Sequence, residues 1–153
     1  MSQLQVDSIS SMGGGHVDGA GKVVQFKEAV NTTEITIASG VTTSILTLNF
    51  TPKFSDSLIL CQGFHSQDLA VNLPSYGYSR IFAGATEVAR VNAVGYNIEK
   101  IPGTRFHPSY SGSVASWGTT SLAITIEVTS LDGVWSVSYQ DKPTSLLVWE
   151  IAQ

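Results

Sequence analysis

The stretch Val41 to Phe64, VTTSILTLNFTPKFSDSLILCQGF, predicts two β-strands and the corner that joins them. In its first half every second residue from Leu46 to Phe50 is apolar, which is typical of a half-buried strand and places Ile45 on the opposite face among polar residues. Thr51-Pro52 follows, and because proline has no backbone N–H, strand pairing is expected to stop there. The largely apolar run from Leu58 to Phe64 then predicts a strand that is buried on both faces.

The same two-residue alternation recurs along the chain and predicts the remaining strands. They are expected at Val23–Val30, Glu34–Ala38, Tyr76–Phe82, Thr86–Val91, Leu122–Val128, Trp135–Tyr139 and Leu146–Ile151. Turns at Ala83-Gly84-Ala85 and Leu131-Asp132-Gly133 predict two hairpins, whereas Gln67 to Val71 predicts a short helical turn inside a loop. About eight strands separated by turns, without an amphipathic helix, favour an all-β fold: an antiparallel, jelly-roll-like β-sandwich.

The segment from Asn92 to Gly118 differs from the rest because glycines and prolines interrupt it repeatedly. Structureless loops longer than about 12–15 residues are uncommon and are often functional. The segment is therefore expected to be either a binding loop or two short irregular strands.

The N-terminal composition divides the chain into an arm and a domain. The 153 residues suit one domain, and because the predicted strands begin just after Lys22, residues 22–153 are expected to form the sandwich. Residues 1–21 combine a short alternating piece with a glycine-rich connector, which leaves this segment little to bury. We therefore expect a partner chain to hold it, with Leu4, Val6 and Ile9 as candidate contact residues.

The charge composition argues against several classes of partner. Only 13% of the residues are charged, the net charge is −4, and the eight Lys and Arg do not cluster, whereas nucleic-acid binding needs a basic footprint. No run approaches the roughly 18 apolar residues of a membrane span, and the N-terminus lacks the features of a secretory signal. We expect no nucleic acid, no membrane insertion, and synthesis in the cytoplasm. Cys61, the only cysteine, is expected to be buried and unreactive.

No motif carries recognisable catalytic chemistry. His16, His65 and His107 stand alone, without a second ligand at metal-binding spacing, and are expected to be polar surface residues. The sequence has no G-x-S-x-G elbow, and its carboxylates lie mostly in turns rather than as the buried pair of a glycosidase. The N-terminal glycines do not fit a phosphate-binding loop, because His16 and Val23 occupy two required positions. We expect no enzyme, no catalytic residue, no cofactor and no metal.

Aromatic and arginine side chains gather in and beside the long loop. These candidate surface-contact residues are Tyr76, Tyr78, Tyr96, Arg105, Phe106, Tyr110 and Trp117. Recognition surfaces are enriched in such residues, but the same side chains are also suited to pinning a glycine-rich loop in place. Trp135, Tyr139 and Trp149 lie on predicted strands and are expected in the core or at a subunit interface.

Several short motifs follow one another in a characteristic order. They are MSQLQVDSI at the start, then G-x-G-K-V-V-Q, the Thr-Pro corner of residues 51–60, the hairpin Tyr78–Phe82 leading into Thr86–Arg90, Gly118-Thr119-Thr120-Ser121, and Glu150-Ile151-Ala152 at the end. Their order, over nearly the whole chain, resembles a family of small tail-associated and fibre-like structural proteins of bacteriophages, especially those of cyanobacterial and marine hosts.

The resemblance implies a non-enzymatic virion component that assembles as a homotrimer. It also implies a β-sandwich head and an N-terminal arm used for attachment to other virion proteins or for chain intertwining. Because this chain has no long shaft repeat, a short tail fibre or host-contact component is favoured over an extended fibre. Two alternatives stay open: a capsid decoration protein of the phage head, and a carbohydrate-binding module whose aromatic loop binds a host surface glycan.

Overall fold

The computed structural model describes residues 21–69, 75–95, 109–115, 117–138 and 142–153. The described residues form eleven strands and no helix, which confirms the predicted all-β class. The strands are β1 (Val23–Asn31), β2 (Ile35–Ile37), β3 (Thr42–Phe50), β4 (Leu58–Phe64), β5 (Gln67–Leu69), β6 (Ser75–Ala83), β7 (Thr86–Gly95), β8 (Ser109–Ala115), β9 (Leu122–Ser130), β10 (Trp135–Val137) and β11 (Thr144–Ile151).

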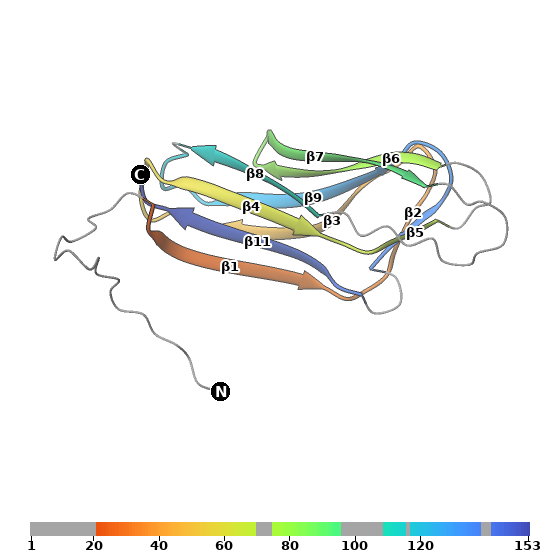
Figure 1. Cartoon of the computed structure of the whole chain (residues 1–153), viewed down its shortest axis with the longest axis horizontal. Coiled ribbons are helices and arrows are strands. Elements are labelled where there is room, and N and C mark those ends of the chain that lie inside the picture. The colour runs from red at the N-terminus through yellow and green to blue at the C-terminus, as the bar shows by residue number, and fades with distance from the viewer. Residues whose placement is uncertain (1–20, 70–74, 96–108, 116, 139–141) are drawn as a thin grey trace, which may run out of the picture.

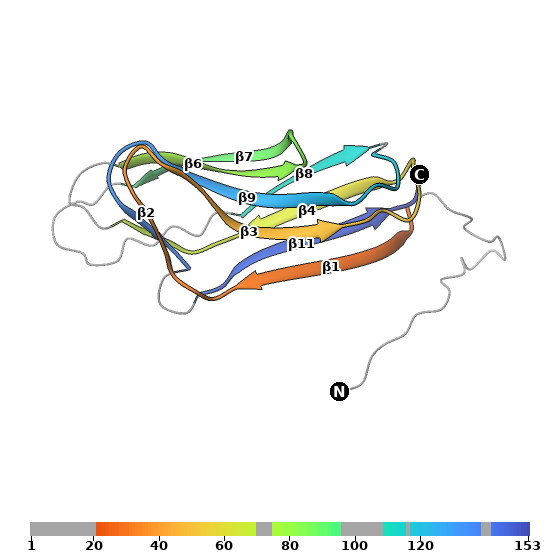
Figure 2. The ribbon, with the colours of Figure 1, turned by 180° about the vertical axis from the view of Figure 1, so that it is seen from behind.

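Eight of these strands are long, and their pairing gives a jelly roll. They form two antiparallel sheets, ordered β1-β11-β4-β8 and β3-β9-β6-β7, which are the two layers seen from opposite sides in Figures 1 and 2. Among the long strands the first pairs with the last (β1 with β11), the second with the seventh, the third with the sixth, and the fourth with the fifth. A four-step antiparallel ladder rolled into a sandwich has this pairing, so the jelly-roll prediction is confirmed.

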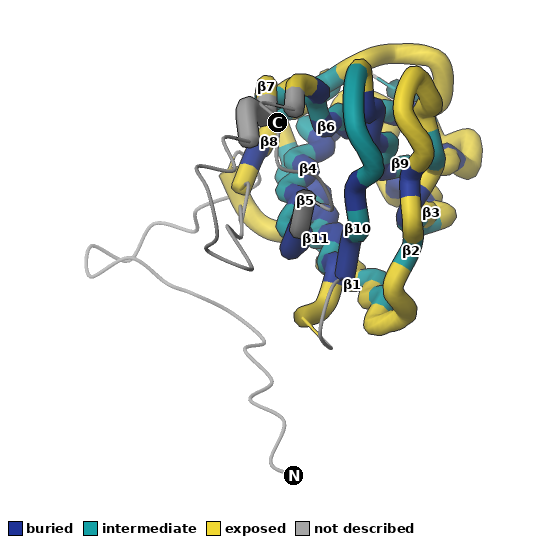
Figure 3. Tube along the Cα trace, turned by 90° about the vertical axis from the view of Figure 1, so that its right-hand side faces the viewer, coloured by how far each residue is buried: buried dark blue, intermediate teal, exposed yellow. Residues whose placement is uncertain are grey.

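Three short strands close one end of the sandwich as a separate sheet, β2-β10-β5 (Figure 3). Each lies in a connection between long strands, and β10 pairs with both of the others. Two predictions were wrong here. Residues 67–69 form a strand rather than a helical turn, because their backbone pairs with β10. The turn at Leu131-Asp132-Gly133 does not make a hairpin, because the chain leaves β9 there and pairs elsewhere.

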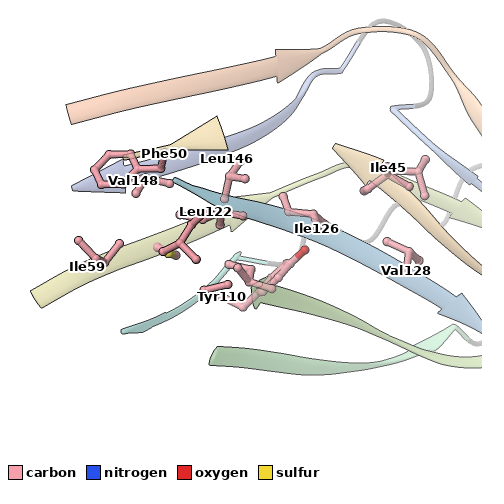
Figure 4. Close-up of a cluster of buried hydrophobic side chains, with 14 of the residues drawn as sticks. Ile45, Phe50, Ile59, Tyr110, Leu122, Ile126, Val128, Leu146 and Val148 are labelled. Atoms are coloured by element: carbon pink, nitrogen blue, oxygen red, sulfur yellow. The ribbon is translucent and has the colours of Figure 1, made fainter. Parts of the chain in front are cut away.

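A β-bulge in β3 changes which residues of the opening stretch enter the core. Ser44 pairs with Glu127 and Leu46 with Ile126, so Ile45 is the extra residue between them. Ile45 is 4% exposed, although simple alternation placed it on the polar face. Figure 4 shows Ile45 and Phe50 among the buried side chains contributed by both layers.

Strand β4 is buried on one face rather than two. Ile59, Cys61 and Gly63 point into the sandwich, whereas Leu58 and Leu60 lie half-exposed on the outside with the other alternate residues. The prediction of burial on both faces was wrong, since within the described residues no further layer covers this side of the sheet.

Part of the interrupted segment is regular. Strand β7 continues to Gly95, and β8 pairs along its whole length with β4, while residues 96–108 lie outside the described residues. The N-terminal segment also lies outside them, including Leu4, Val6 and Ile9. The described chain starts at Gly21, whose N–H donates to Ala152 at the end of β11.

Candidate functional site

The outer face of the β3-β9-β6-β7 sheet carries a stack of aromatic rings and guanidinium groups. The Arg80 guanidinium lies over the rings of Tyr78 and Phe82, at 4.9 and 4.8 Å from their centroids. Its Nη2 donates to Glu127 on the neighbouring strand at 3.0 Å. Alternation along β6 places all three side chains on one face, and pairing with β9 brings the carboxylate beside them.

A second arginine extends this stack onto β7. The Arg90 guanidinium lies 4.5 Å from the centroid of the Tyr78 ring, so this ring is contacted by two cations. Arg90 also donates twice to Glu87, at 3.0 and 3.1 Å, and these bonds lower the pKa of Glu87. Glu87 approaches Arg80 as well, at 3.6 Å, so one carboxylate serves both guanidinium groups. We call Tyr78, Arg80, Phe82, Glu87, Arg90 and Glu127 the arginine–aromatic stack.

The stack exposes planar rings and guanidinium groups, but the charges of its arginines are already paired with glutamates. Both arginines are paired with carboxylates, although the Nε atom of Arg80 is buried without a hydrogen-bond partner. An anion must therefore compete with glutamates that are already in place. The arrangement is suited to stacking against a planar or ring-shaped group.

The structure separates the predicted contact residues. Tyr76 is 42% exposed and Tyr78 half-buried on the face that carries the stack. Tyr110 is 6% exposed, so its prediction as a surface residue was wrong: on β8 it points into the sandwich. Trp117 is half-buried against the core and packs beside Gly84, which supports the pinning interpretation for this residue. Tyr96, Arg105 and Phe106 lie outside the described residues.

A polar cluster lies inside the sandwich around His65. This side chain is 2% exposed, so its prediction as a surface residue was wrong. Its Nε2 lies 3.1 Å from the Ser79 hydroxyl and 3.4 Å from Gln67 Oε1, and its ring meets Tyr110 edge-on at 5.9 Å. Burial raises the pKa of Tyr110 well above its usual range. These groups satisfy one another within the core, and a serine this deeply buried does not meet a substrate.

The Thr-Pro corner is tied to the last strand by a buried carboxylate. Glu150 accepts backbone hydrogen bonds from Lys53, at 2.8 Å, and from Phe54, at 2.9 Å. It also accepts from Ser57 Oγ at 2.8 Å and from Gln25 Nε2 at 2.6 Å. Burial opposes the charge of Glu150, yet the four donors together lower its pKa below the ordinary value of 4.5. The role of this carboxylate is structural, because every donor belongs to the fold.

The outer face of the β1-β11-β4-β8 sheet is a further surface that the sequence did not reveal. Strand pairing arranges its outward residues in four rows, each crossing β1, β11, β4 and β8 in that order. The rows are Val23, Ile151, Leu58, Ala115; Phe26, Trp149, Leu60, Ser113; Glu28, Leu147, Gln62, Ser111; and Val30, Ser145, Phe64, Ser109. We call these sixteen residues the apolar grid.

The apolar grid is most exposed along β1. Val23, Phe26 and Val30 on β1 are 51%, 49% and 52% exposed, and they are three of the seven large hydrophobic residues that are exposed among the described residues. The Phe26 ring lies 5.4 Å from that of Trp149. Glu28 is the single charged member of the grid. A surface of this kind marks an interaction site.

Within the described parts of the chain, no group of three His, Cys, Asp or Glu side chains is placed to hold a metal ion. No helix in the same residues has the length and apolar character needed to cross a membrane.

Comparison with known proteins gives weak likenesses only. No protein-family model and no curated protein matches the chain, so the resemblance to phage tail-associated proteins stays a prediction. Similar solved structures include that of infectious bursal disease virus Gx strain (15% identity, TM-score 0.48, covering 85% of this chain and 33% of that chain). Others are the VP2 subviral particle of the same virus (10%, 0.49, 85% and 34%) and its Gt strain (13%, 0.47, 98% and 43%).

This chain therefore spans less than half the length of each of these matched chains. Its jelly-roll assignment follows from its own strand pairing.

Proposed function

We propose that this chain is a non-enzymatic structural subunit of a bacteriophage particle, a short tail fibre or host-contact component that assembles with copies of itself. The observation that carries the proposal is the apolar grid, an almost uncharged face on a protein whose opposite sheet face is polar. The order of the sequence motifs supports the phage origin and the homotrimer. The N-terminal arm attaches the subunit to other virion proteins.

The proposal is tested on purified particles. Mass spectrometry of intact virions is expected to detect the chain, and cryo-electron microscopy to place it at the tail. A location over the whole capsid, in many more copies than a tail carries, identifies a decoration protein instead. Absence of the chain from purified particles refutes both structural roles.

A glycan-binding role is the second candidate, and the arginine–aromatic stack favours it. Exposed aromatic faces stack against sugar rings, and Tyr76 and Tyr78 lie on the same outer sheet face. Host-cell or glycan-array binding is expected to fall in Tyr78→Ala, which removes the ring that both guanidinium groups contact. Thr47→Ala on the same sheet is the matched control, since its exposed side chain lies on β3, two strands away from Tyr78 on β6. Absence of binding to glycans and host cells by the unmodified chain refutes this role.

A further inference from the structure

We propose that the apolar grid binds the apolar grid of a second copy of this chain. The two copies are related by a two-fold axis that runs parallel to the strands between β11 and β4. In this arrangement β1 of one copy lies over β8 of the other, and β11 lies over β4. The inference rests on the proposed self-assembly but not on its homotrimer, since a two-fold contact builds dimers or multiples of dimers.

The extent of the grid is sufficient for such a contact. Four strands about 4.8 Å apart and roughly 25 Å long give a face of about 500 Å² per copy. The pair would then bury about 1,000 Å², which is the lower limit for a specific interface. Two sheets that pack face to face in this way interdigitate their side chains about 10 Å apart.

The proposed axis places the large residues of β1 over the small residues of β8. The bulk of the grid lies on β1, β11 and β4, while the outward residues of β8 are three serines and an alanine. Rotation about the axis keeps each row in place and exchanges its ends. Besides the pair that contains Glu28, the residues brought together are Phe26 with Ser113, Val23 with Ala115, Val30 with Ser109, Phe64 with Ser145, Trp149 with Leu60, Ile151 with Leu58, and Leu147 with Gln62.

The same axis gives the charge of the grid a polar partner. Glu28 comes to lie over Ser111 of the second copy, whose hydroxyl group is exposed and able to donate a hydrogen bond. The two-fold axis perpendicular to the strands has no such match. It places Glu28 over Phe26 of the second copy and opposes the serines of both β8 strands, which leaves a buried charge and a gap.

A second copy matches this face better than a partner of different shape. The grid is close to self-complementary in both size and polarity, which is the property that an isologous interface requires. Its uncharged character also gives a charged partner nothing to pair with except Glu28.

The experiment measures the mass of the full chain in solution by sedimentation equilibrium, with circular dichroism to verify folding. Unmodified chain and the control Thr47→Arg, which alters the opposite sheet face, are expected to be dimers or multiples of dimers. Phe26→Arg and Ser113→Arg are each expected to raise the dissociation constant by at least about tenfold, because each places a charge in an apolar contact. The Ser113 variant is informative because non-specific apolar association through β1 would not be weakened by a change on β8.

A charge exchange tests the axis itself. Ser111→Glu places two carboxylates face to face and is expected to weaken the dimer by at least about tenfold. Adding Glu28→Lys to Ser111→Glu is expected to restore the dimer, because each lysine then lies over a glutamate of the other copy. If the double variant does not restore the dimer, the proposed axis is wrong.

Three further outcomes overturn the interface. The first is a chain that stays monomeric at all concentrations, and the second is a trimer whose mass Phe26→Arg and Ser113→Arg do not change. The third is stronger binding of an apolar dye to the grid after residues 1–20 are removed. The last outcome identifies the N-terminal segment as the occupant. A chain present in virions but monomeric in solution refutes the interface and leaves the structural role intact. A chain that dimerises in solution but is absent from virions supports the interface and refutes the structural role.

Discussion

The carboxylate of Glu150 joins the last strand to the Thr-Pro corner, and its replacement tests what that connection contributes to stability. In Glu150→Gln an amide takes the place of a group that accepts bonds from two backbone N–H groups and two side chains. The new NH₂ faces other donors in a buried setting, so the free energy of unfolding is expected to fall by about 2–3 kcal/mol. Urea titration followed by tryptophan fluorescence measures the change. Glu34→Gln, at an exposed position, is the control and is expected to change stability by less than about 0.5 kcal/mol.

Glu150 also predicts how stability depends on pH. Burial opposes its charge, but its hydrogen-bond donors hold its folded pKa below the ordinary value of 4.5. A carboxyl group with a lowered folded pKa contributes stability that is complete above the unfolded pKa and is lost as pH falls through the folded one. The thermal unfolding midpoint of the wild type is therefore expected to fall below pH 4.5, and that of Glu150→Gln to fall less over the same pH range. Parallel curves for the two proteins would show that other groups control the acid limb.

Single residues differed in how far the sequence disclosed their environment. Cys61 lies in an alternating apolar strand, and its predicted burial is confirmed. Tyr110 stands between serines in a glycine-rich segment, where local composition gave no indication that it enters the core. The stack depends on contacts such as Arg80 with Glu127, 47 residues apart, so only strand pairing brings it together.

At the scale of elements, two glycines let strands approach more closely than side chains allow. A Cβ at position 112 on β8 would overlap the backbone carbonyl of Val88 on β7, and one at position 77 on β6 would overlap the Trp135 ring. Gly112→Ala and Gly77→Ala are each expected to lower the free energy of unfolding by about 3 kcal/mol or more, because backbone or a buried ring must move. Gly118→Ala serves as control: its surroundings are open, and only its positive φ of 83° opposes the change, at a cost of about 1–2 kcal/mol. Urea midpoints rank the three variants, and an equal loss in all of them would refute the close-approach explanation.

Elements with clean alternation were predictable, whereas those set by their neighbours were not. Strand β9 follows a two-residue period both in the sequence and in its burial, whereas β1 has a bulge after Val23 and β4 and β11 are largely apolar at all positions. The bulge at Ile45 depends on how β3 aligns with β9, and the extended form of β5 depends on β10. Strand β8 has little apolar character because its outer residues are small, and it therefore resembled an irregular loop.

At the scale of the molecule, the fold class followed from the sequence but the surface did not. Counting strands and turns was sufficient to favour a sandwich, because few architectures bury many short antiparallel strands. Predicting the apolar grid requires the register of β1 with β11, of β11 with β4 and of β4 with β8, and these strands come from segments that span nearly the whole described chain. Phe26 and Ser113 show no relation in the sequence until that register joins them.

The single thiol gives a test of whether the sandwich opens as one unit. Cys61 is buried on β4 with its side chain between the two sheets, and burial raises its pKa to about 12. Because the thiolate is the reactive form, labelling by a disulfide reagent near neutral pH is expected to be negligible in the folded chain and complete in denaturant. The native labelling rate then reports the population of open molecules.

This rate is expected to rise at least about tenfold in Gly112→Ala, because a loss of about 1.4 kcal/mol already gives that factor. It is expected to rise far less in Thr47→Ala, whose exposed side chain lies outside the core. Fast labelling of the unmodified chain would show instead that β4 opens locally at the sheet centre, independently of the strands on either side of it.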